Sequence, residues 1–286
     1  MRDRYDNRAR LYARFWAPVL QRSAEAVLDR VAAHDRGPIG RLVDLGTGTG
    51  TLARAAARRF PDAQVVGVDF SRGMLAVARA LADEELGGRN GRLEWVEANA
   101  ARLPLADASV DAVISSFVLQ LVPRRQPVYR EVRRVLRPGG RFAFVTWCLD
   151  KSPFAPSEAF EDVLDELDIP VDEEPEEKVA GDFVSVAAAA ASLRRAGFRE
   201  VRAEPATLEY AFTAGSYEEY KLRYDDRTLM EGLRPSIRRR VEGRFRQKLA
   251  ALPADAFLLK APIVYATARQ AGPASGPRAR PAGRPG

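Results

Sequence analysis

The chain has 286 residues, 46% of them hydrophobic, which is enough to bury one sizeable core. A single cysteine, Cys148, excludes an intrachain disulfide, and no apolar stretch reaches the ~20 residues of a membrane span, so the sequence predicts a cytoplasmic protein without a secretion signal. The formal net charge of +6 comes from arginines that alternate with acids on the expected helix faces, which favours solvated faces over a nucleic-acid-binding surface.

The N-terminal segment, residues 1–36, is expected to form a helical cap. Its first half is polar, with aromatic side chains such as Tyr12 interleaved. This pattern fits either an amphipathic helix that packs on the core or a lid over a bound cofactor. Residues 19–31 then repeat apolar side chains at helical spacing. The only histidine, His34, follows that helix and is expected on a surface loop rather than as a catalytic base.

A glycine-rich turn follows the first expected strand, residues 41–45, and leads into a helix over residues 51–60. The glycines at 46, 48 and 50 allow a close approach of the backbone to a ligand, because they carry no Cβ. Unpaired N–H groups at the helix start complete a nucleotide-type cofactor site. A dinucleotide site would need glycine at position 51, which is threonine, and no Lys-Ser/Thr pair of a phosphate-binding loop follows. Asp44 would repel a pyrophosphate but suits an ammonium group, so an amino-acid nucleoside is favoured.

The second expected strand, residues 64–70, carries an acid near its end, Asp69. A carboxylate at this place can accept hydrogen bonds from two ribose hydroxyls, and we expect that role here. The alternative is a helix-capping acid before Ser71, where a helix over residues 71–85 begins.

Strands and helices continue to alternate as far as residue 147. Alternation of this kind predicts an α/β fold with an open, mostly parallel sheet. Further strands are expected at residues 92–98, 110–116 and 141–147, with a helix at 124–136 and a turn at 138–140.

The alternation stops after residue 147, and lid or cap insertions are expected at residues 151–184 and 216–252. The first contains a helix at 160–167 and an acidic run at 172–177, interpreted as a solvated loop, and the second contains two helices. One domain is expected over residues 1–270, completed by a helix at 186–196 and strands at 200–212 and 256–268. The Gly, Pro, Ala and Arg composition of residues 271–286 predicts a disordered tail.

Four motifs follow one another over about residues 40–147. They are Val-Asp-Leu-Gly-Thr-Gly-Thr-Gly at 43–50, Val-Gly-Val-Asp-Phe-Ser at 66–71, Ala-Asn-Ala at 98–100 continued through Leu103-Pro104 to Val-Asp-Ala-Val at 110–113, and Leu-Arg-Pro-Gly-Gly at 136–140. As a set they resemble class I S-adenosylmethionine-dependent methyltransferases of the small-molecule type, similar to the menaquinone/ubiquinone-biosynthesis group. The resemblance implies a Rossmann-like, seven-stranded, mostly parallel sheet with helices on both faces, an antiparallel last strand and a helical lid or cap.

The resemblance also implies where S-adenosylmethionine binds. The glycine turn would pass under the methionine and ribose, while Asp44 would hold the ammonium end and Asp69 the ribose hydroxyls. Asn99 stands where the family usually has aspartate, but its amide oxygen can still accept from the adenine amino group. Ser115 and Ser116 end the fourth strand beside the expected sulfonium position. The expected cofactor contacts are Tyr12, Asp44, Gly46, Thr47, Gly48, Gly50, Asp69, Phe70, Met74, Asn99, Ala100 and Ser115.

The implied reaction is methyl transfer to a small organic molecule, with carbon, nitrogen and oxygen acceptors left open. A sulfonium methyl is already activated, so alignment alone can supply about 7–11 kcal/mol of the barrier, and no catalytic residue is assigned. The tyrosines at 217, 220 and 224 are expected either to line the acceptor pocket or to pack within a helical cap. Two alternatives remain, a cyclase-type activity that retains the cofactor and methylation of RNA or protein. One cysteine and one histidine cannot build a Cys/His metal site, so no metal is expected.

Overall fold

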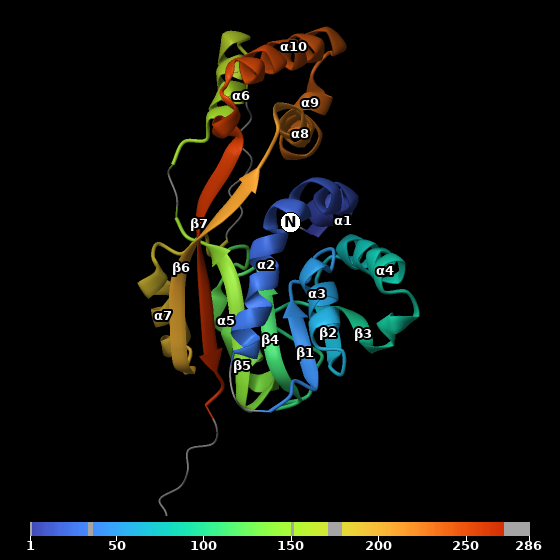
Figure 1. The fold of residues 1–286 in the computed structure, drawn as a ribbon, viewed down its shortest axis with the longest axis vertical. Coiled ribbons are helices and arrows are strands. Elements are labelled where there is room, and N and C mark those ends of the chain that lie inside the picture. The colour runs from blue at the N-terminus through green and yellow to red at the C-terminus, as the bar shows by residue number, and fades with distance from the viewer. Residues whose placement is uncertain (1, 34–36, 150–151, 171–178, 272–286) are drawn as a thin grey trace, which may run out of the picture.

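The computed structural model describes residues 2–33, 37–149, 152–170 and 179–271, and Figure 1 shows its fold. Seven strands form one sheet in the order β3-β2-β1-β4-β5-β7-β6. The strands are β1 (Arg41–Leu45), β2 (Gln64–Asp69), β3 (Leu93–Glu97), β4 (Val110–Ser116), β5 (Leu136–Trp147), β6 (Arg199–Ala211) and β7 (Leu258–Arg269). The predicted Rossmann-like α/β class is therefore confirmed. His34, the acidic run at 172–177 and residues 272–286 of the expected tail lie outside the described residues.

Helices precede, connect and follow these strands. In chain order they are α1 (Arg2–Leu11), α2 (Ala17–Ala32), α3 (Thr51–Arg59), α4 (Arg72–Leu86), α5 (Arg125–Val135), α6 (Ala155–Glu166), α7 (Val186–Arg195), α8 (Ala214–Tyr220), α9 (Arg227–Gly232) and α10 (Pro235–Ala251). Two π-helical segments, η1 (Tyr12–Trp16) and η3 (Lys221–Asp225), follow α1 and α8 directly. Short 3-10 turns lie at η2 (Gly87–Arg92) and η4 (Ala254–Phe257).

The strand β1 is the middle one of the five parallel strands and pairs with β2 and β4. The strands β3 and β5 extend the parallel part, and β7 runs antiparallel to both β5 and β6, as predicted for the last strand. Parallel strands place their carboxyl ends at one edge of the sheet, and a ligand crevice forms where the strand order reverses, here between β1 and β4.

Helices cover both faces of the sheet (Figure 1). On one face, Leu42 of β1 belongs to a buried cluster with Val27 of α2 and Leu52 of α3. On the other, Val43 belongs to a cluster with Val128 of α5 and other residues of α5 and α7. Both faces of β1 are thus buried, which explains why the parallel strands read as nearly continuous apolar runs in the sequence.

The strands β6 and β7 run on, still paired, beyond the other strands, and α8, η3, α9 and α10 follow at their far end (Figure 1). The helix α6 packs beside α10, with the ring centroids of Phe160 and Phe245 5.0 Å apart. Residues 216–252 form more helices than the expected two, because Arg234 is extended before Pro235 (φ −57°, ψ 143°) and so separates α9 from α10. Steric conflict with a following proline disfavours the helical conformation at that residue.

The expected turn at residues 138–140 lies inside β5, which begins at Leu136. Gly139 has a φ of +77°, and the register of β5 against β4 shifts between Val110 and Ala112. The glycine therefore bends a continuous strand instead of separating a helix from a strand, as an irregularity of the ladder does.

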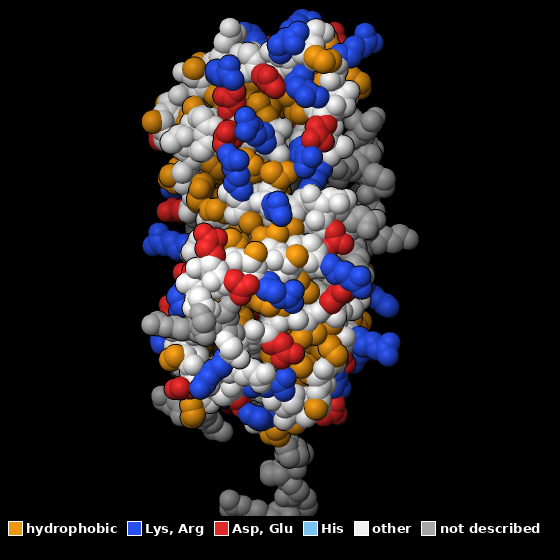
Figure 2. Space-filling model, turned by 90° about the vertical axis from the view of Figure 1, so that its right-hand side faces the viewer, with side chains coloured by type: hydrophobic (Ala, Val, Ile, Leu, Met, Phe, Trp, Pro, Cys, Tyr) orange, Lys and Arg blue, Asp and Glu red, His pale blue; other side chains and the backbone are white. Residues whose placement is uncertain are grey.

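The surface mixes charges of both signs. Figure 2 shows basic side chains interspersed with acidic ones on the face that it views. Exposed ion pairs such as Arg246–Glu218 (2.6 Å) and Arg227–Glu231 (2.7 Å) belong to this pattern. Within the described ranges, no helix combines the length and the apolarity that crossing a membrane requires. No group of three or more His, Cys, Asp or Glu side chains placed to hold a metal ion occurs among these residues either.

Candidate functional site

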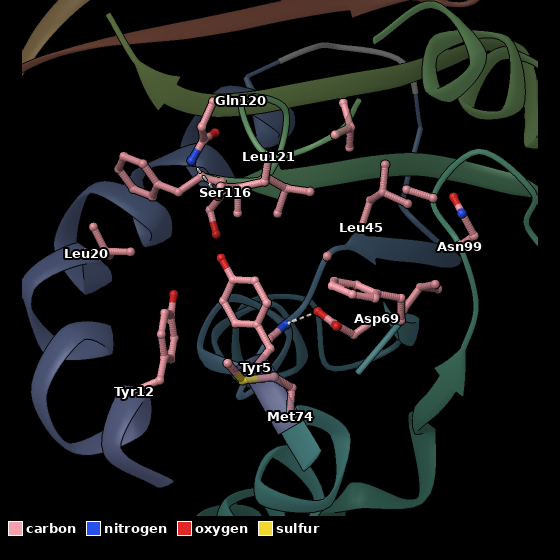
Figure 3. A pocket seen from close by; sticks show the side chains of 18 of the residues that line it. Tyr5, Tyr12, Leu20, Leu45, Asp69, Met74, Asn99, Ser116, Gln120 and Leu121 are labelled. Atoms are coloured by element: carbon pink, nitrogen blue, oxygen red, sulfur yellow. Dashed lines mark hydrogen bonds between the residues drawn. The ribbon is translucent and has the colours of Figure 1, made fainter. Parts of the chain in front are cut away.

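A cavity of about 440 Å³ opens at the carboxyl ends of β1, β2 and β4 (Figure 3). Its walls come from the turn after β1, the end of β2 with the start of α4, and the segments that follow β3 and β4. Tyr5, Tyr12 and Trp16 of α1 and η1 form a further wall. Segments that are far apart in the sequence thus meet where the order of the sheet reverses, as the glycine turn predicted.

The glycines of the turn have φ angles of +72° at Gly46, +53° at Gly48 and +78° at Gly50, a region that disfavours side chains. A Cβ at Gly46 would lie 2.3 Å from Val118 Cγ2, and a Cβ at Gly50 would lie 2.6 Å from the ring of Trp95. A Cβ at Gly48 would instead have its nearest neighbour 4.0 Å away, across the cavity. Gly48 therefore faces the cavity, where a Cβ would only reach ordinary contact distance from Tyr12, whereas the other two make room for the protein's own side chains.

The side chain of Asp69 joins the glycine turn to the start of α4. Its Oδ2 accepts a hydrogen bond from the Gly48 N–H at 2.8 Å, and its Oδ1 accepts one from the Ser71 N–H at 2.9 Å (Figure 3 draws the first). Burial raises the pKa of the Asp69 carboxyl, although both N–H groups favour the charged form. A carboxylate has about four acceptor positions, so this one can still accept from two ribose hydroxyls.

Asp44 lies one layer deeper, in β1, and is 1% exposed. Its Oδ2 accepts a hydrogen bond from the Thr47 hydroxyl at 2.6 Å, whereas its Oδ1 makes no hydrogen bond of good geometry among the described residues, and the Ala53 backbone N–H also favours the charged form of the carboxyl. Burial raises the pKa of Asp44 to about 7, against the opposing effect of the Thr47 hydrogen bond. A buried carboxylate oxygen without a donor is costly, and an ammonium group would supply the missing partner. Thr47 therefore orients Asp44 and takes part in the site through it.

Replacing Asp44 by asparagine is expected to stabilise the ligand-free protein at alkaline pH while weakening cofactor binding about tenfold. The pKa of Asp44 is about 7 in the folded chain against 3.8 for the unperturbed group, so the folded state holds the extra proton between these values. Its contribution to stability is thus complete below about pH 4 and is lost as the pH rises through about 7, by at most about 4 kcal/mol. Thermal melting should show a gain for the variant that is much larger at about pH 8 than at about pH 5. An equal gain at both would contradict the raised pKa.

The other end of the cavity offers surfaces for a planar base. Phe70 and Met74 line it, as do Asn99 and Ala100, in the positions that the sequence predicted. The Asn99 Oδ1 already accepts a hydrogen bond from the Ala101 N–H at 2.8 Å, which fixes the amide. A second lone pair of the same oxygen remains for an adenine amino group.

The two serines at the end of β4 point in different directions. Ser115 is fully buried, and its hydroxyl donates to the Leu45 carbonyl at 2.8 Å. Ser116 lines the cavity, and Figure 3 shows its hydroxyl directed into it. Of the two, Ser116 lines the cavity and Ser115, the expected cofactor contact, does not, because adjacent side chains of a strand face opposite sides.

The N-terminal segment both packs on the core and covers the cavity, the two roles that its sequence pattern left open. The ring of Tyr5 meets that of Phe70 edge-on, with centroids 6.0 Å apart. Tyr12 lines the cavity, and burial raises the pKa of its hydroxyl far above the usual value, so the group stays protonated. Tyr12 can therefore offer a hydrogen bond but does not act as a base near neutral pH.

The three tyrosines of the cap pack against other rings. The ring of Tyr220 stacks on that of Trp16 at 5.5 Å, and Tyr217 meets Phe212 edge-on at 5.3 Å. Tyr224 lies 6.5 Å from Tyr12. They therefore support the wall of the cavity from behind, which favours the packing interpretation over direct contact with a substrate.

Sequence reasoning missed the wall that follows β4. Phe117 has a φ of +54°, rare for a bulky residue, and its ring lies 4.5 Å from that of Trp147. The Gln120 amide donates to the Phe117 carbonyl at 2.8 Å and accepts from the Thr146 hydroxyl at 2.6 Å. A signal was present, because Phe-Val-Leu-Gln-Leu-Val-Pro at 117–123 is an almost wholly apolar loop at the carboxyl edge of the sheet. Backbone strain of this kind is typical of functional sites.

These groups together fit an amino-acid nucleoside. The Asp44 oxygen lacks a donor that an ammonium would supply, the bare backbone at Gly48 leaves space, and Asp69 offers acceptors at the expected ribose position. With the strand order described above, such a site resembles that of class I S-adenosylmethionine-dependent methyltransferase domains. Comparison with known proteins agrees, because residues 43–144 match the family model described as a methyltransferase domain. The resemblance predicted from the motifs is thus confirmed for this stretch, and S-adenosylmethionine is the cofactor that such domains use.

The chain is similar to curated methyltransferases over this part. It is 40% identical over 114 residues to the ubiquinone/menaquinone biosynthesis C-methyltransferase of Desulfotalea psychrophila, a match that covers 40% of this chain and 42% of that protein. It is 38% identical over 128 residues to the malonyl-acyl-carrier-protein O-methyltransferase of Methylococcus capsulatus, covering 45% of each chain. The matched part spans less than half the length of either relative.

Solved structures share the fold over a longer part of the chain. The cyclase SpnF has a TM-score of 0.56 at 19% identity, covering 91% of this chain and 83% of that one. Phosphoethanolamine N-methyltransferase 2 of Haemonchus contortus, solved with S-adenosyl-L-methionine, has a TM-score of 0.52 at 20% identity, covering 87% of this chain and 52% of that one. At these identities the likeness concerns the fold alone.

Proposed function

We propose that this protein transfers the methyl group of S-adenosylmethionine to a small, uncharged organic molecule. The observation that carries the proposal is one continuous cavity, in which groups suited to the cofactor continue into an apolar, aromatic wall. The name of one curated relative, a quinone-biosynthesis C-methyltransferase, supports a small acceptor, whereas that of another, a malonyl-acyl-carrier-protein O-methyltransferase, names an acceptor carried by a protein. Analysis of the methylated product identifies which atom of the acceptor receives the methyl group.

The residues at the cofactor end of the cavity would bind S-adenosylmethionine and fix its orientation. Asp69 would accept from the ribose hydroxyls and Asp44 would pair with the ammonium group, while the Gly48 backbone lets the ligand approach. The bound cofactor supplies an activated methyl group on a sulfonium, and the protein's part is to align an acceptor with it. Preorganisation by buried, hydrogen-bonded side chains is how a protein achieves this without a strong acid or base.

The acceptor end is apolar and aromatic. Trp16, Phe117 and Trp147 contribute rings to it, and Gln120 holds the loop with both ends of its amide engaged within the protein. Among the described residues that line the cavity, Asp69 is the only one whose side chain is ordinarily charged at neutral pH. A phosphate or carboxylate on the acceptor would therefore find no cation in this wall, and burying such a charge unpaired is costly. The wall thus favours neutral, ring-containing acceptors.

The test is formation of S-adenosylhomocysteine from S-adenosylmethionine in the presence of single acceptors. A panel of neutral phenols, hydroquinones and aromatic amines should contain substrates, and phosphorylated counterparts should react at least about tenfold more slowly. Mass spectrometry of the product then assigns the methylated atom. A cofactor that binds but yields no S-adenosylhomocysteine with any acceptor would contradict methyl transfer and favour the cyclase-type alternative.

A further inference from the structure

The side chain of Asp6 joins the helix α1 to the N-terminus of α4. Its Oδ1 accepts hydrogen bonds from the Ser71 hydroxyl at 2.5 Å and from the Gly73 N–H at 2.8 Å. Ser71 is itself the N-cap of α4, because its Oγ accepts from the Met74 N–H at 3.1 Å. A carboxylate at this point also meets the partial positive charge of the helix end, so the contact is charge-assisted.

The backbones of the two helices touch at the same place. A Cβ at Gly73 would lie 2.5 Å from the Asp6 carbonyl oxygen and 2.7 Å from its Cα. Glycine at this position is therefore required for α1 to dock, since neither neighbouring atom is the end of a flexible side chain. The docking is close enough to be sensitive to a single methyl group.

The docking point adjoins the cofactor end of the cavity. Ser71 donates its N–H to Asp69 and its hydroxyl to Asp6, so one residue links the expected ribose acceptor to α1. Next to Asp6 in the chain, Tyr5 lines the cavity and packs on Phe70. With α1 docked, Tyr5 and Tyr12 line the same cavity as Gly48 and Met74, and Figure 3 shows Tyr5 beside Met74.

We propose that Asp6 is a positioning residue that latches α1 over the cofactor end, and that release of this latch lets the cofactor exchange. The proposal rests on the proposed function in that the ligand is taken to be S-adenosylmethionine or its product. It assigns to Asp6 control over how long the ligand stays, through Ser71 and Tyr5 rather than through contact with the ligand.

The same N-terminal segment makes another polar contact, which is weaker than that of Asp6 because it is exposed to solvent. Arg14 of η1 forms an ion pair with Glu219 of α8 at 3.2 Å, with side chains 59% and 44% exposed. Water and salt screen a pair of this kind, which contributes little to stability. The variant Glu219→Gln therefore serves as the control, because it removes the charge from a side-chain contact of this segment that lies away from the cavity.

The first test uses the full-length chain with Asp6→Ala. Dissociation of S-adenosylhomocysteine, followed by stopped-flow competition, should become about tenfold faster, and Glu219→Gln should change it less than about twofold. Hydrogen exchange of the backbone amides of residues 5–16 in the ligand-free protein should accelerate in Asp6→Ala, while the amides of β1 and β4 keep their protection. A merely structural role would instead lower protection throughout the sheet and the melting temperature with it.

The second test uses Gly73→Ala, which displaces α1 without removing a charge. Alanine is a better helix former than glycine, so α4 itself should not be weakened. Faster exchange in residues 5–16 and faster ligand dissociation, with no loss of melting temperature, are expected. Unchanged exchange in this segment in both variants would overturn the latch.

The two proposals fail in different ways. A wild-type protein that binds no S-adenosylhomocysteine would contradict the proposed function, and hydrogen exchange without ligand would still decide the latch. A wild-type protein that binds the ligand, with dissociation rates unchanged in Asp6→Ala and Gly73→Ala, would overturn the latch alone.

Discussion

Replacing Asp69 by alanine is expected to weaken the binding of S-adenosylhomocysteine by at least about a hundredfold while the sheet stays folded. The carboxylate has two functions at once, since it fixes the Gly48 and Ser71 N–H groups and presents its remaining acceptor positions to the cavity. The variant loses the ribose acceptors and leaves two N–H groups without their partner. Isothermal calorimetry measures the affinity, and circular dichroism and thermal melting follow the fold.

Asp111 provides a matched control for this variant. Its Oδ2 also accepts from two backbone N–H groups, those of Gly40 and Arg41, at 2.9 and 2.8 Å, but at the amino end of β1. The variant Asp111→Ala should lower the melting temperature and leave the affinity within about twofold of wild type, because the same chemistry is removed far from the cavity. Calorimetry that shows Asp69→Ala binding as tightly as Asp111→Ala would refute the assignment of Asp69.

Replacing Gly48 by valine should have an effect of similar size, with loss of binding of at least about a hundredfold. The φ of +53° at this position strains a side chain, and the added atoms would occupy the cavity between the turn and Tyr12. Strain alone lowers stability, so the loss of affinity has to be separated from it. Equilibrium binding of S-adenosylhomocysteine, measured at a temperature well below the melting point, makes this separation.

Gly87 supplies the comparison for backbone strain. It has a φ of +54°, and an added Cβ there has nothing within 4 Å. The variant Gly87→Val should therefore be destabilised by the left-handed conformation without losing affinity for the ligand. If both valine variants lost affinity equally, the assignment of Gly48 as the glycine that faces the ligand would be wrong.

The parallel part of the sheet was predictable because its strands are buried on both faces. Leu42 and Val43 pack into two different hydrophobic clusters, one on each face of the sheet. The strand therefore has no polar face, and its sequence is a continuous apolar run that is easily identified. The acids at 44 and 69 were visible for the same reason, since a charged residue inside an apolar run indicates a site. At the end of an apolar run, however, the pattern does not indicate which of two adjacent side chains faces the cavity. Ser115 was therefore predicted as a cofactor contact and Ser116 was not.

The rest of the site depends on contacts that are distant in the chain. Gly50 is required because Trp95 of β3 lies against it, and Gly46 because Val118 after β4 does. The spacing of the glycines in the sequence does not show these different reasons. The role of Asp6 likewise depends on α1 meeting α4, 65 residues away along the chain. The helices of the cap are interrupted at Arg234 because Pro235 follows it. The prediction of two helices relied on apolar periodicity and did not take this proline into account.

The long pair of strands that carries the cap has an evolutionary consequence. Ala211 at the end of β6 pairs with Leu258 at the start of β7, and the Phe212 N–H donates to the Phe257 carbonyl at 3.0 Å. The intervening segment therefore leaves and re-enters the sheet at neighbouring points, as the loop of a single hairpin does. Such a segment can lengthen, shorten or be exchanged in a lineage without altering the register of β1 to β5. Length changes in the outer part of this segment can therefore leave the pairing of the parallel strands intact, while the rings of Tyr220 and Tyr224 still have to meet Trp16 and Tyr12.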